Sequence, residues 1–257
     1  MCWRQDGRDA AAPRDLERVV RAALAEAPTL HRWAAARSER SIHAGRGTIH
    51  VVRLGPTEAA VRRFHRGGWM APLLGDRYLG RPPRPFVELA TSERARERGI
   101  ATPRVLAAVA YPARPGYRAE IATEWLSPGH GLGALLVPGA YPEPVRAAAL
   151  EAAGEAVGRA HAAGLDHPDL NVSNLFLQPA PDGRWTAWIL DLDRARFREG
   201  ADPGQAAPAG FAGRNVGRLE RSIGKARRAG RARWTEIDRT ALLDGWRRAI
   251  GGRRRGR

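Results

Sequence analysis

The residues best suited to chemistry in this sequence stand on either side of two short apolar runs. Asp169 and Asn174 precede the first run, in the string HPDLNVSN, and Asp191 directly follows the second run, in WILDLD. Asp193 lies two residues further on, where it can point the same way as Asp191. Carboxylate and amide oxygens are the hard ligands that suit Mg²⁺ when it bridges to phosphates. A carboxylate that is not bound to the metal can accept a proton from an attacking hydroxyl group.

Regular elements with clear local signals position these residues. The alanine-rich segment 144–163 predicts a helix that has proline in its first turn and stops at Gly164. Segments 175–177 and 187–190 predict two short strands, joined by the turn PAPDGRW, that return the chain to the polar residues. Most of the chain beyond residue 193 predicts helix. We therefore expect the three carboxylates and the amide to converge beside an apolar support.

The first half of the chain is richer in strand patterns. Apolar periodicity and Gly-containing turns predict a helix, three short strands, a second helix and two further strands, at residues 13–28, around 42, 49–52, 60–64, 86–98, 105–110 and 118–125. A stretch with Pro and several Gly, 127–133, predicts a hinge. This order predicts an α+β protein with two unequal lobes that face each other across a cleft. We divide it into an N-terminal helical extension, a small β-rich N-lobe and a mainly helical C-lobe, at residues 1–40, 41–126 and 127–257.

The polar residues resemble the catalytic loop of the protein-kinase-like fold. In that fold His-x-Asp is followed five residues later by Asn, and His167, Asp169 and Asn174 have this spacing. The triplet DLD at residues 191–193 stands where protein kinases have Asp-Phe-Gly, and its Asp193 either assists a metal or caps the following turn. Asp and Asn are also common in ordinary turns. Two matches in the right order, on the expected loop and strand, favour the kinase interpretation.

This resemblance implies a bilobal protein-kinase-like fold that uses ATP and Mg²⁺. Asp169 is then the catalytic residue that orients the acceptor hydroxyl and accepts its proton late in a loose transition state. Asn174 and Asp191 are the implied metal ligands, which hold Mg²⁺ on the ATP phosphates. Backbone groups from Glu124 to Leu126 are expected to bind the adenine, as a hinge strand does in this fold.

The N-terminal half offers phosphate contacts that match this fold imperfectly. Gly45 and Gly47 lie between strand-like segments, where the fold has a glycine-rich loop over the nucleotide phosphates, but the third glycine of the usual pattern is absent. Arg62 occupies the place of the strand lysine that reaches the phosphates, and arginine can bind phosphate bidentately. Its carboxylate partner is expected on the next helix. Glu88 is preferred and Glu93 is the alternative, because the sequence does not fix the rotation of that helix.

A longer stretch is similar to one group of kinases in particular. The string RRFHRGGWMAPLLGDRYLGRPPRPFVEL, the string DLDR at 191–194 and the pattern of Asn215, Arg218 and Ser222 resemble the 3-deoxy-D-manno-octulosonic acid (Kdo) kinase family of lipopolysaccharide kinases. The likeness runs from about residue 45 to about residue 225. It implies phosphate transfer from ATP to the 4-hydroxyl of Kdo on a lipid A precursor. It also implies a peripheral protein on the cytoplasmic face of the bacterial inner membrane.

The charge of the chain is strongly basic and uneven. Forty-three Lys and Arg residues against 27 Asp and Glu give a net charge of +16, and residues 212–257 alone carry 15 basic and 4 acidic side chains, a net +11. Such a segment predicts a phosphate-bearing partner, and a basic residue near an anionic leaflet contributes about 1 kcal/mol. The anionic inner-membrane surface is therefore an expected partner. A general bias towards Ala, Arg, Gly and Pro is an equal alternative explanation for the excess.

Two alternatives to Kdo phosphorylation remain open at this point. A kinase of this type could instead phosphorylate a core heptose, a small molecule or a protein. A basic nucleic-acid-binding protein belongs to a different class, but the eight tryptophans are dispersed and do not interleave with a basic stripe, so we expect no specific nucleic-acid partner. The single cysteine cannot form an internal disulfide, and no apolar run approaches the ~20 residues that cross a bilayer. We expect a cytoplasmic protein, either soluble or on a membrane surface.

Overall fold

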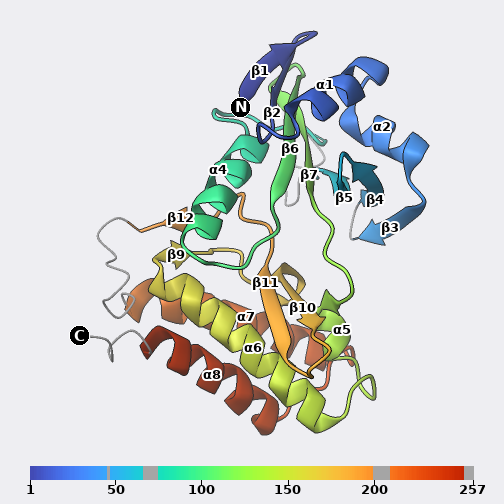
Figure 1. Cartoon of the computed structure of the whole chain (residues 1–257). Coiled ribbons are helices and arrows are strands. Elements are labelled where there is room, and N and C mark those ends of the chain that lie inside the picture. Colours follow the sequence, from blue (N-terminus) through green and yellow to red (C-terminus); the bar gives the residue numbers. More distant parts are fainter. Residues whose placement is uncertain (45–46, 66–74, 199–208, 252–257) are drawn as a thin grey trace. The chain divides into compact units, whose positions relative to one another are not determined.

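The computed structural model describes residues 1–44, 47–65, 75–198 and 209–251 (Figure 1). The chain forms two compact units. The first unit consists of Met1–Glu93 and Pro103–Trp125, and the second consists of Arg94–Thr102 and Leu126–Arg257. One large sheet organises the first unit and helices dominate the second, so the predicted α+β class is confirmed. None of the helices in the described ranges combines the length and the hydropathy needed to cross a bilayer.

A seven-stranded sheet forms the centre of the first unit, and every pair of neighbouring strands is antiparallel. Its strands are β1 (Cys2–Gln5), β2 (Arg8–Ala11), β3 (Arg40–Ala44), β4 (Gly47–Leu54), β5 (Thr57–Arg63), β6 (Val105–Pro112) and β7 (Tyr117–Glu124). They lie in the order β1-β2-β6-β7-β5-β4-β3. The first six residues of β6 are all buried, which explains its continuous apolar run. Gly55, with a φ of 63°, allows the tight turn that pairs Leu54 with Thr57.

The segment predicted as a helical extension, residues 1–40, contains two helices and also contributes two strands to the sheet, which the prediction did not include. β1 and β2 form a hairpin, and β2 pairs with β6. Asp6 and Gly7 form its turn with φ angles of 48° and 76°, the conformation that Asp-Gly favours in tight hairpins. The two strands have four residues each and include charged side chains in place of apolar alternation. Their sequence therefore lacks the periodic signal of a strand.

Three helices pack on this sheet, namely α1 (Glu17–Glu26), α2 (Leu30–Arg37) and α4 (Arg84–Glu97). α1 lies within the helix predicted over 13–28 and buries Val20 and Leu24 in an apolar cluster shared with the sheet. Phe86 and Leu89 of α4 pack on a second apolar cluster that also includes sheet residues. The position of these two side chains fixes which face of α4 is turned towards the sheet.

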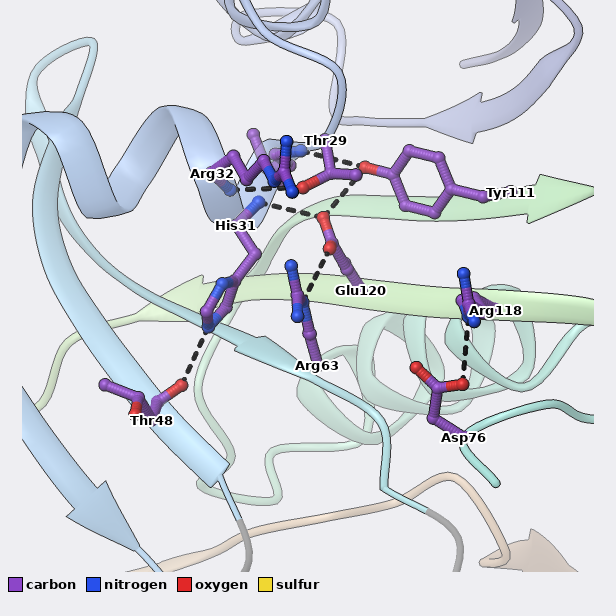
Figure 2. A network of polar contacts seen from close by, with 10 residues as sticks. Thr29, His31, Arg32, Thr48, Arg63, Asp76, Tyr111, Arg118 and Glu120 are labelled. Carbon is purple, nitrogen blue, oxygen red and sulfur yellow. Dashed lines mark hydrogen bonds and ion pairs between the residues drawn. The ribbon is translucent and has the colours of Figure 1, made fainter. Parts of the chain in front are cut away.

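A buried carboxylate on β7 attaches α2 to the sheet (Figure 2). Glu120 Oε2 accepts hydrogen bonds from the His31 backbone N–H and from the Tyr111 hydroxyl, both at 2.8 Å. Its Oε1 accepts from Arg63 Nε at 3.2 Å. The Tyr111 oxygen accepts in turn from the Leu30 N–H at 2.8 Å. Burial and the adjacent Glu120 carboxylate raise the pKa of Tyr111, so the phenol stays protonated and the network stays intact at neutral pH.

The second unit combines helices with two small sheets. Its helices are α5 (Leu132–Leu135), α6 (Glu143–Ala162), the 3₁₀ helix η1 (Val172–Asn174), α7 (Ala209–Arg228) and α8 (Glu236–Gly251). Its strands are β8 (His130–Gly131), β9 (Leu165–Asp166), β10 (Leu175–Pro179), β11 (Trp185–Ile189) and β12 (Arg196–Phe197). The predicted hairpin is confirmed as β10 and β11, which pair Leu175 with Ile189. The helix predicted over 144–163 is confirmed as α6.

α6 and α8 meet at close range along what we call the α6–α8 seam (Figure 1). A Cβ atom on Gly154 would lie 2.0 Å from a backbone oxygen of α8, and one on Gly245 would lie 2.1 Å from a backbone oxygen of α6. Neither position has room for a side chain. The seam also contains a buried ion pair, in which Arg146 Nε donates to Asp238 Oδ1 at 2.7 Å. The two helices are therefore joined by backbone proximity and by one enclosed charge pair.

Candidate active site

The polar loop, residues 167–174, follows β9 and is bonded to the end of β11. The His167 side chain is buried, and its Nε2–H donates to the Leu190 carbonyl at 3.1 Å. Because a carbonyl only accepts, this bond fixes the proton on Nε2. Burial lowers the pKa of His167, although the bond to Leu190 acts in the opposite direction. The imidazole is therefore a neutral link between the polar loop and the strand.

Asn174 joins the polar loop to the same strand end. Its backbone carbonyl accepts from the Leu190 N–H at 2.9 Å, which extends the β10–β11 pairing by one step. Its side-chain Nδ2 donates to the Asp169 carbonyl at 3.0 Å, and Asn171 Nδ2 donates to the same oxygen at 2.7 Å. Since Nδ2 is engaged within the loop, the other polar atom of the Asn174 carboxamide, Oδ1, is the one suited to accept from or coordinate an external group.

Asp191 stands two residues after the end of β11 in an unusual backbone conformation. Its φ of 60° lies in the left-handed region, which costs a residue with a side chain about 1–2 kcal/mol, although Asp enters it more readily than most. Such strained positions cluster at functional sites. Because Leu190 bonds to both His167 and Asn174, the segments that carry Asp191, Asn174 and the rest of the polar loop are directly connected.

The Asp169 carboxylate has a partner that the sequence pattern did not assign. Arg194 Nη1 donates to Asp169 Oδ2 at 2.9 Å. The two side chains are 39% and 56% exposed, so the pair lies at the surface of the second unit. The carboxylate therefore faces solvent, where a dissolved or lipid-bound hydroxyl can reach it.

α7 supports the polar loop with one of its faces. Arg218 donates a short hydrogen bond to the Pro168 carbonyl. Ser222 Oγ accepts from the Val172 N–H at 3.0 Å. Asn215 Nδ2 donates to a carboxylate of β9, Asp166, at 3.2 Å. These contacts hold both the loop and the strand that leads into it.

Arg62 of β5 and Glu88 of α4 form an ion pair within the first unit. Arg62 Nη2 lies 3.0 Å from both carboxylate oxygens of Glu88. The Glu88 side chain is only 4% exposed, whereas Arg62 is 27% exposed and its guanidinium lies 4.8 Å from the ring centre of Phe64. The predicted pairing of Arg62 with Glu88 is confirmed, and the rotation of α4 selects Glu88 over the alternative, Glu93.

The predicted glycine-rich loop is described only in part. Gly45 lies outside the described residues. Gly47 opens β4 and pairs with Ala44 across the β3–β4 hairpin. A Cβ atom on Gly47 would lie 2.3 Å from His65 Nε2, so the absence of a side chain lets the imidazole approach the strand.

The predicted adenine-binding residues lie where the first unit ends. The Glu124 N–H donates to the Arg104 carbonyl at 2.8 Å, as the last rung of the β6–β7 pairing. The Trp125 N–H donates to the Glu58 carbonyl at 2.9 Å. Leu126 is buried and is the first residue of the second unit after β7. The role of Glu124 and Leu126 in nucleotide binding stays a prediction.

A model of one protein family spans both the Arg62–Glu88 pair and the polar loop. The family described as "Lipopolysaccharide kinase (Kdo/WaaP) family" matches residues 30–246. The chain belongs to this family. It is therefore a kinase of lipopolysaccharide biosynthesis, a phosphotransferase with an alcohol group as acceptor, and the predicted family is confirmed.

Relatives of this lipopolysaccharide kinase agree with that assignment. A 3-deoxy-D-manno-octulosonic acid kinase of Vibrio vulnificus (strain YJ016) is 30% identical over 205 residues, which cover 79% of this chain and 80% of the relative. One of Xanthomonas oryzae pv. oryzae (strain PXO99A) is 34% identical over 189 residues, covering 71% and 68%. A solved structure, "WaaP in complex with acyl carrier protein", superposes with a TM-score of 0.56 at 20% identity, covering 93% of this chain and 88% of that one. The protein-kinase-like fold is thus confirmed.

The two predicted Mg²⁺ ligands supply only part of the six donors that this ion prefers. In the part of the chain that the structure describes, no group of three or more His, Cys, Asp or Glu is arranged to hold a metal. The predicted ligands, Asn174 and Asp191, supply two oxygen donors on joined segments. Mg²⁺ commonly binds through one or two protein carboxylates and completes its shell with water and substrate phosphates. The donor set is therefore suited to an ion that arrives with a nucleotide.

The sequence indicated the importance of three residues without indicating what they contact, namely Arg194, Arg218 and Ser222. All three belong to strings that resemble the family, but no local pattern says what they contact. Their partners, Asp169, Pro168 and Val172, are 25 or 50 residues away in sequence. Only the folded chain reveals that they contact the polar loop.

Proposed function

We propose that this lipopolysaccharide kinase transfers the terminal phosphoryl group of ATP to the 4-hydroxyl of a Kdo residue on a lipid A precursor. One observation carries the proposal. Hydrogen bonds join the polar loop to the end of β11 and so connect the segments that bear Asp169, Asn174 and Asp191. The relatives that bear the name Kdo kinase and cover most of this chain support the choice of acceptor.

Asp169 is the proposed catalytic residue. The acceptor oxygen forms a bond to the terminal phosphorus while the bond from that phosphorus to the bridging oxygen of ADP breaks, and the hydroxyl proton passes to the Asp169 carboxylate. The loose transition state of phosphoryl transfer places this proton transfer late, so orientation of the hydroxyl is the main task of the carboxylate. Its exposure of 39% and its fixed backbone carbonyl suit a group that must meet an incoming acceptor.

Asn174 and Asp191 are the proposed ligands of Mg²⁺. The ion, when bound, neutralises charge on the nucleotide phosphates. Asn174 presents Oδ1 because its Nδ2 is held by the Asp169 carbonyl. Asp191 has a positive φ two residues after the end of β11. Both side chains therefore start from backbone positions that the loop and the hairpin determine.

Residues of the first unit are proposed to bind the rest of ATP. Arg62 contacts the phosphates, and Glu88 positions its guanidinium through the 3.0 Å contacts. The backbone amides from Gly45 to Gly47 cover the phosphates, and backbone groups from Glu124 to Leu126 bind the adenine. Arginine suits the first task because its planar group can bind phosphate oxygens in pairs.

The exposed side of α7 supports peripheral attachment to the anionic cytoplasmic face of the inner membrane. Arg214, Arg221 and Arg228 follow one another at intervals of two helical turns and are exposed, as is Lys225. The single acidic residue of α7, Glu220, pairs with an arginine of α8 at 2.7 Å. We expect sedimentation with phosphatidylglycerol vesicles to fall when all three arginines are changed to Gln. Unchanged sedimentation would show that α7 is not the attachment surface.

An acceptor comparison tests the proposed function. The purified protein is incubated with ATP and Mg²⁺ and with one of three acceptors: a Kdo-bearing lipid A precursor, a heptosylated core, or a protein. We expect phosphate to enter the first acceptor and Asp169→Ala to lower turnover by about 10²–10⁴-fold, the usual contribution of a positioned acid–base group. Asp182→Ala, on the exposed turn between β10 and β11, is the control and should keep full activity.

Each result of this comparison has a definite meaning. Transfer to the heptosylated core alone would reject Kdo as the acceptor and leave the kinase chemistry in place. Full turnover by Asp169→Ala would reject the assignment of the catalytic residue.

A further inference from the structure

Arg194 occupies a fixed position beside the proposed catalytic residue. It lies in a turn that the Ala195 N–H closes by donating to the Leu192 carbonyl at 3.1 Å. Leu192 and Ala195 on either side of the turn are buried, at 0% and 5% exposed. The backbone of Arg194 is therefore anchored, while its side chain is 56% exposed and extends to Asp169.

Most N–H donors of the Arg194 guanidinium remain available to bind a ligand. In the described part of the chain it makes one hydrogen bond, from Nη1 to Asp169 Oδ2. A guanidinium carries five N–H donors in a planar fork that matches a carboxylate. Neighbouring arginines are committed elsewhere, since Arg218 donates to the Pro168 carbonyl and Arg198 pairs with Asp166. Arg194 is thus the cation placed to meet a negatively charged group that comes to Asp169.

We infer that Arg194 binds the carboxylate of a sugar-acid acceptor, an inference that rests on the proposed function. In Kdo the carboxylate is attached to the ring carbon that lies two ring bonds from the carbon bearing the 4-hydroxyl. A sugar that brings this hydroxyl to Asp169 also brings its carboxylate close to a guanidinium whose Nη1 is 2.9 Å from the Asp169 oxygen. Charge-assisted pairing of arginine with carboxylate adds both affinity and direction.

The contact between Arg194 and Asp169 also means that binding of the acceptor can release the Asp169 carboxylate. While the guanidinium is bonded to Oδ2, it competes with the acceptor hydroxyl for the same carboxylate. When the guanidinium turns to the carboxylate of the acceptor, Oδ2 is released to receive the hydroxyl. A neutral sugar lacks the group that draws Arg194 away, so Arg194 favours acids over neutral sugars of the same shape.

The test pairs one variant with one change in the acceptor. Wild type and Arg194→Gln are assayed with the Kdo-bearing lipid A precursor and with the same lipid after its Kdo carboxyl has been reduced to an alcohol. For wild type, we expect kcat/KM to be about 10- to 100-fold lower with the reduced acceptor, as expected for one charge-assisted hydrogen-bonded pair. Arg194→Gln should lose a similar factor on the natural acceptor, mainly through KM. On the reduced acceptor it should equal or exceed wild type, because no guanidinium then occupies Asp169 Oδ2.

Two further variants serve as controls. Arg184 forms an exposed pair with Asp182 on the turn between β10 and β11, so Arg184→Gln should behave as wild type with both acceptors. Arg194→Lys keeps the charge and loses the fork, so it should recover part of the preference for the acid.

The possible failures are distinguishable. If wild type phosphorylates no Kdo-bearing glycolipid, the proposed function fails and this inference fails with it. If wild type is active and Arg194→Gln loses the same factor with both acceptors, Arg194 acts on Asp169 or on the nucleotide and only this inference fails. Equal activity of wild type with the acid and with the reduced acceptor would also overturn it.

Discussion

Two arginine–aspartate pairs in the second unit have similar bond lengths and opposite surroundings. In the α6–α8 seam, Arg146 Nε lies 2.7 Å from Asp238 Oδ1, and the side chains are 2% and 0% exposed. In the polar loop, Arg194 Nη1 lies 2.9 Å from Asp169 Oδ2, and the side chains are 56% and 39% exposed. The distance between the charges therefore does not distinguish a pair that holds the fold from a pair that is able to exchange partners.

What distinguishes the two pairs is whether their remaining polar atoms face protein or solvent. Asp238 Oδ2 also accepts from the Thr235 N–H at 2.8 Å, and Arg146 Nη1 donates to the Tyr141 carbonyl at 3.3 Å. The seam pair is thus buried among protein groups, although Arg146 Nη2 makes no hydrogen bond to the described residues and lies 3.9 Å from Glu143 Oε2. The Arg194 guanidinium faces solvent with most of its donors available. Burial makes the first pair structural, and exposure leaves the second open to a ligand.

Breaking the enclosed pair should have the largest effect on stability. Asp238→Ala removes the buried partner of Arg146 and leaves only the more distant and more exposed Glu143, 3.9 Å from Arg146 Nη2; breaking a buried pair typically costs about 3–5 kcal/mol. Urea unfolding should show this loss as a lower midpoint. Asp244→Ala is a matched control on the same helix, because Asp244 is half exposed in its pair with Arg247 and should contribute less than about 1 kcal/mol. Equal effects of the two variants would mean that burial does not separate the two kinds of pair.

The seam should also make stability depend on pH. His161 of α6 accepts from Trp246 Nε1 of α8 at 3.0 Å through Nδ1, and burial lowers its pKa to about 4. Because the folded-state pKa lies below the unfolded value of about 6.5, the contribution is complete above pH 6.5 and declines as the pH falls towards 4. Linkage gives a loss on the order of 2 kcal/mol between pH 7.5 and pH 5.

Urea unfolding at these two pH values, with wild type and His161→Gln, measures this dependence. The variant should lose less stability than wild type over the interval. Part of the dependence should remain, since burial also lowers the pKa of His167. An identical loss in both proteins would show that His161 does not titrate as its surroundings require.

The exposed pair should matter least for stability. Arg194→Gln removes a pair in which both groups already face solvent, so the free energy of unfolding should change by less than about 1 kcal/mol. The same urea experiment measures it. A loss as large as that of Asp238→Ala would make Arg194 a structural residue and remove the contrast between the two regions.

Elements with strong local signals were the predictable part of the fold. α6 and the β10–β11 hairpin carry helix stops, apolar runs and a turn in contiguous sequence, and the predicted and observed bounds agree closely. The β1–β2 hairpin was not predicted. Its Asp6-Gly7 turn is a local signal, but the strands are short, and β2 gains its stability from pairing with β6, about 100 residues away in sequence.

In the candidate site, too, some features were predictable from local sequence and others depend on tertiary structure. The spacing of Asp169, Asn174 and Asp191 predicted the polar loop and the strand β11, which ends shortly before Asp191. The choice of Glu88 as the partner of Arg62 depends on the rotation of α4, which apolar contacts with the sheet determine. The contact of Arg194 with Asp169 arises because hydrogen bonds to Leu190 bring the end of β11 against the loop. Such contacts depend on tertiary structure and have no signature in local sequence.

The most direct test of the central claim measures how strongly Mg²⁺ assists ATP binding. Calorimetric titration of wild type with ATP should give tighter binding with Mg²⁺ than with a chelator. Asp191→Asn keeps a residue that tolerates positive φ and removes the charge, so it should remain folded and lose most of this Mg²⁺-dependent gain. Asp182→Asn, on the exposed turn between β10 and β11, should keep the gain in full. An Asp191→Asn protein with the wild-type Mg²⁺ dependence would contradict the account.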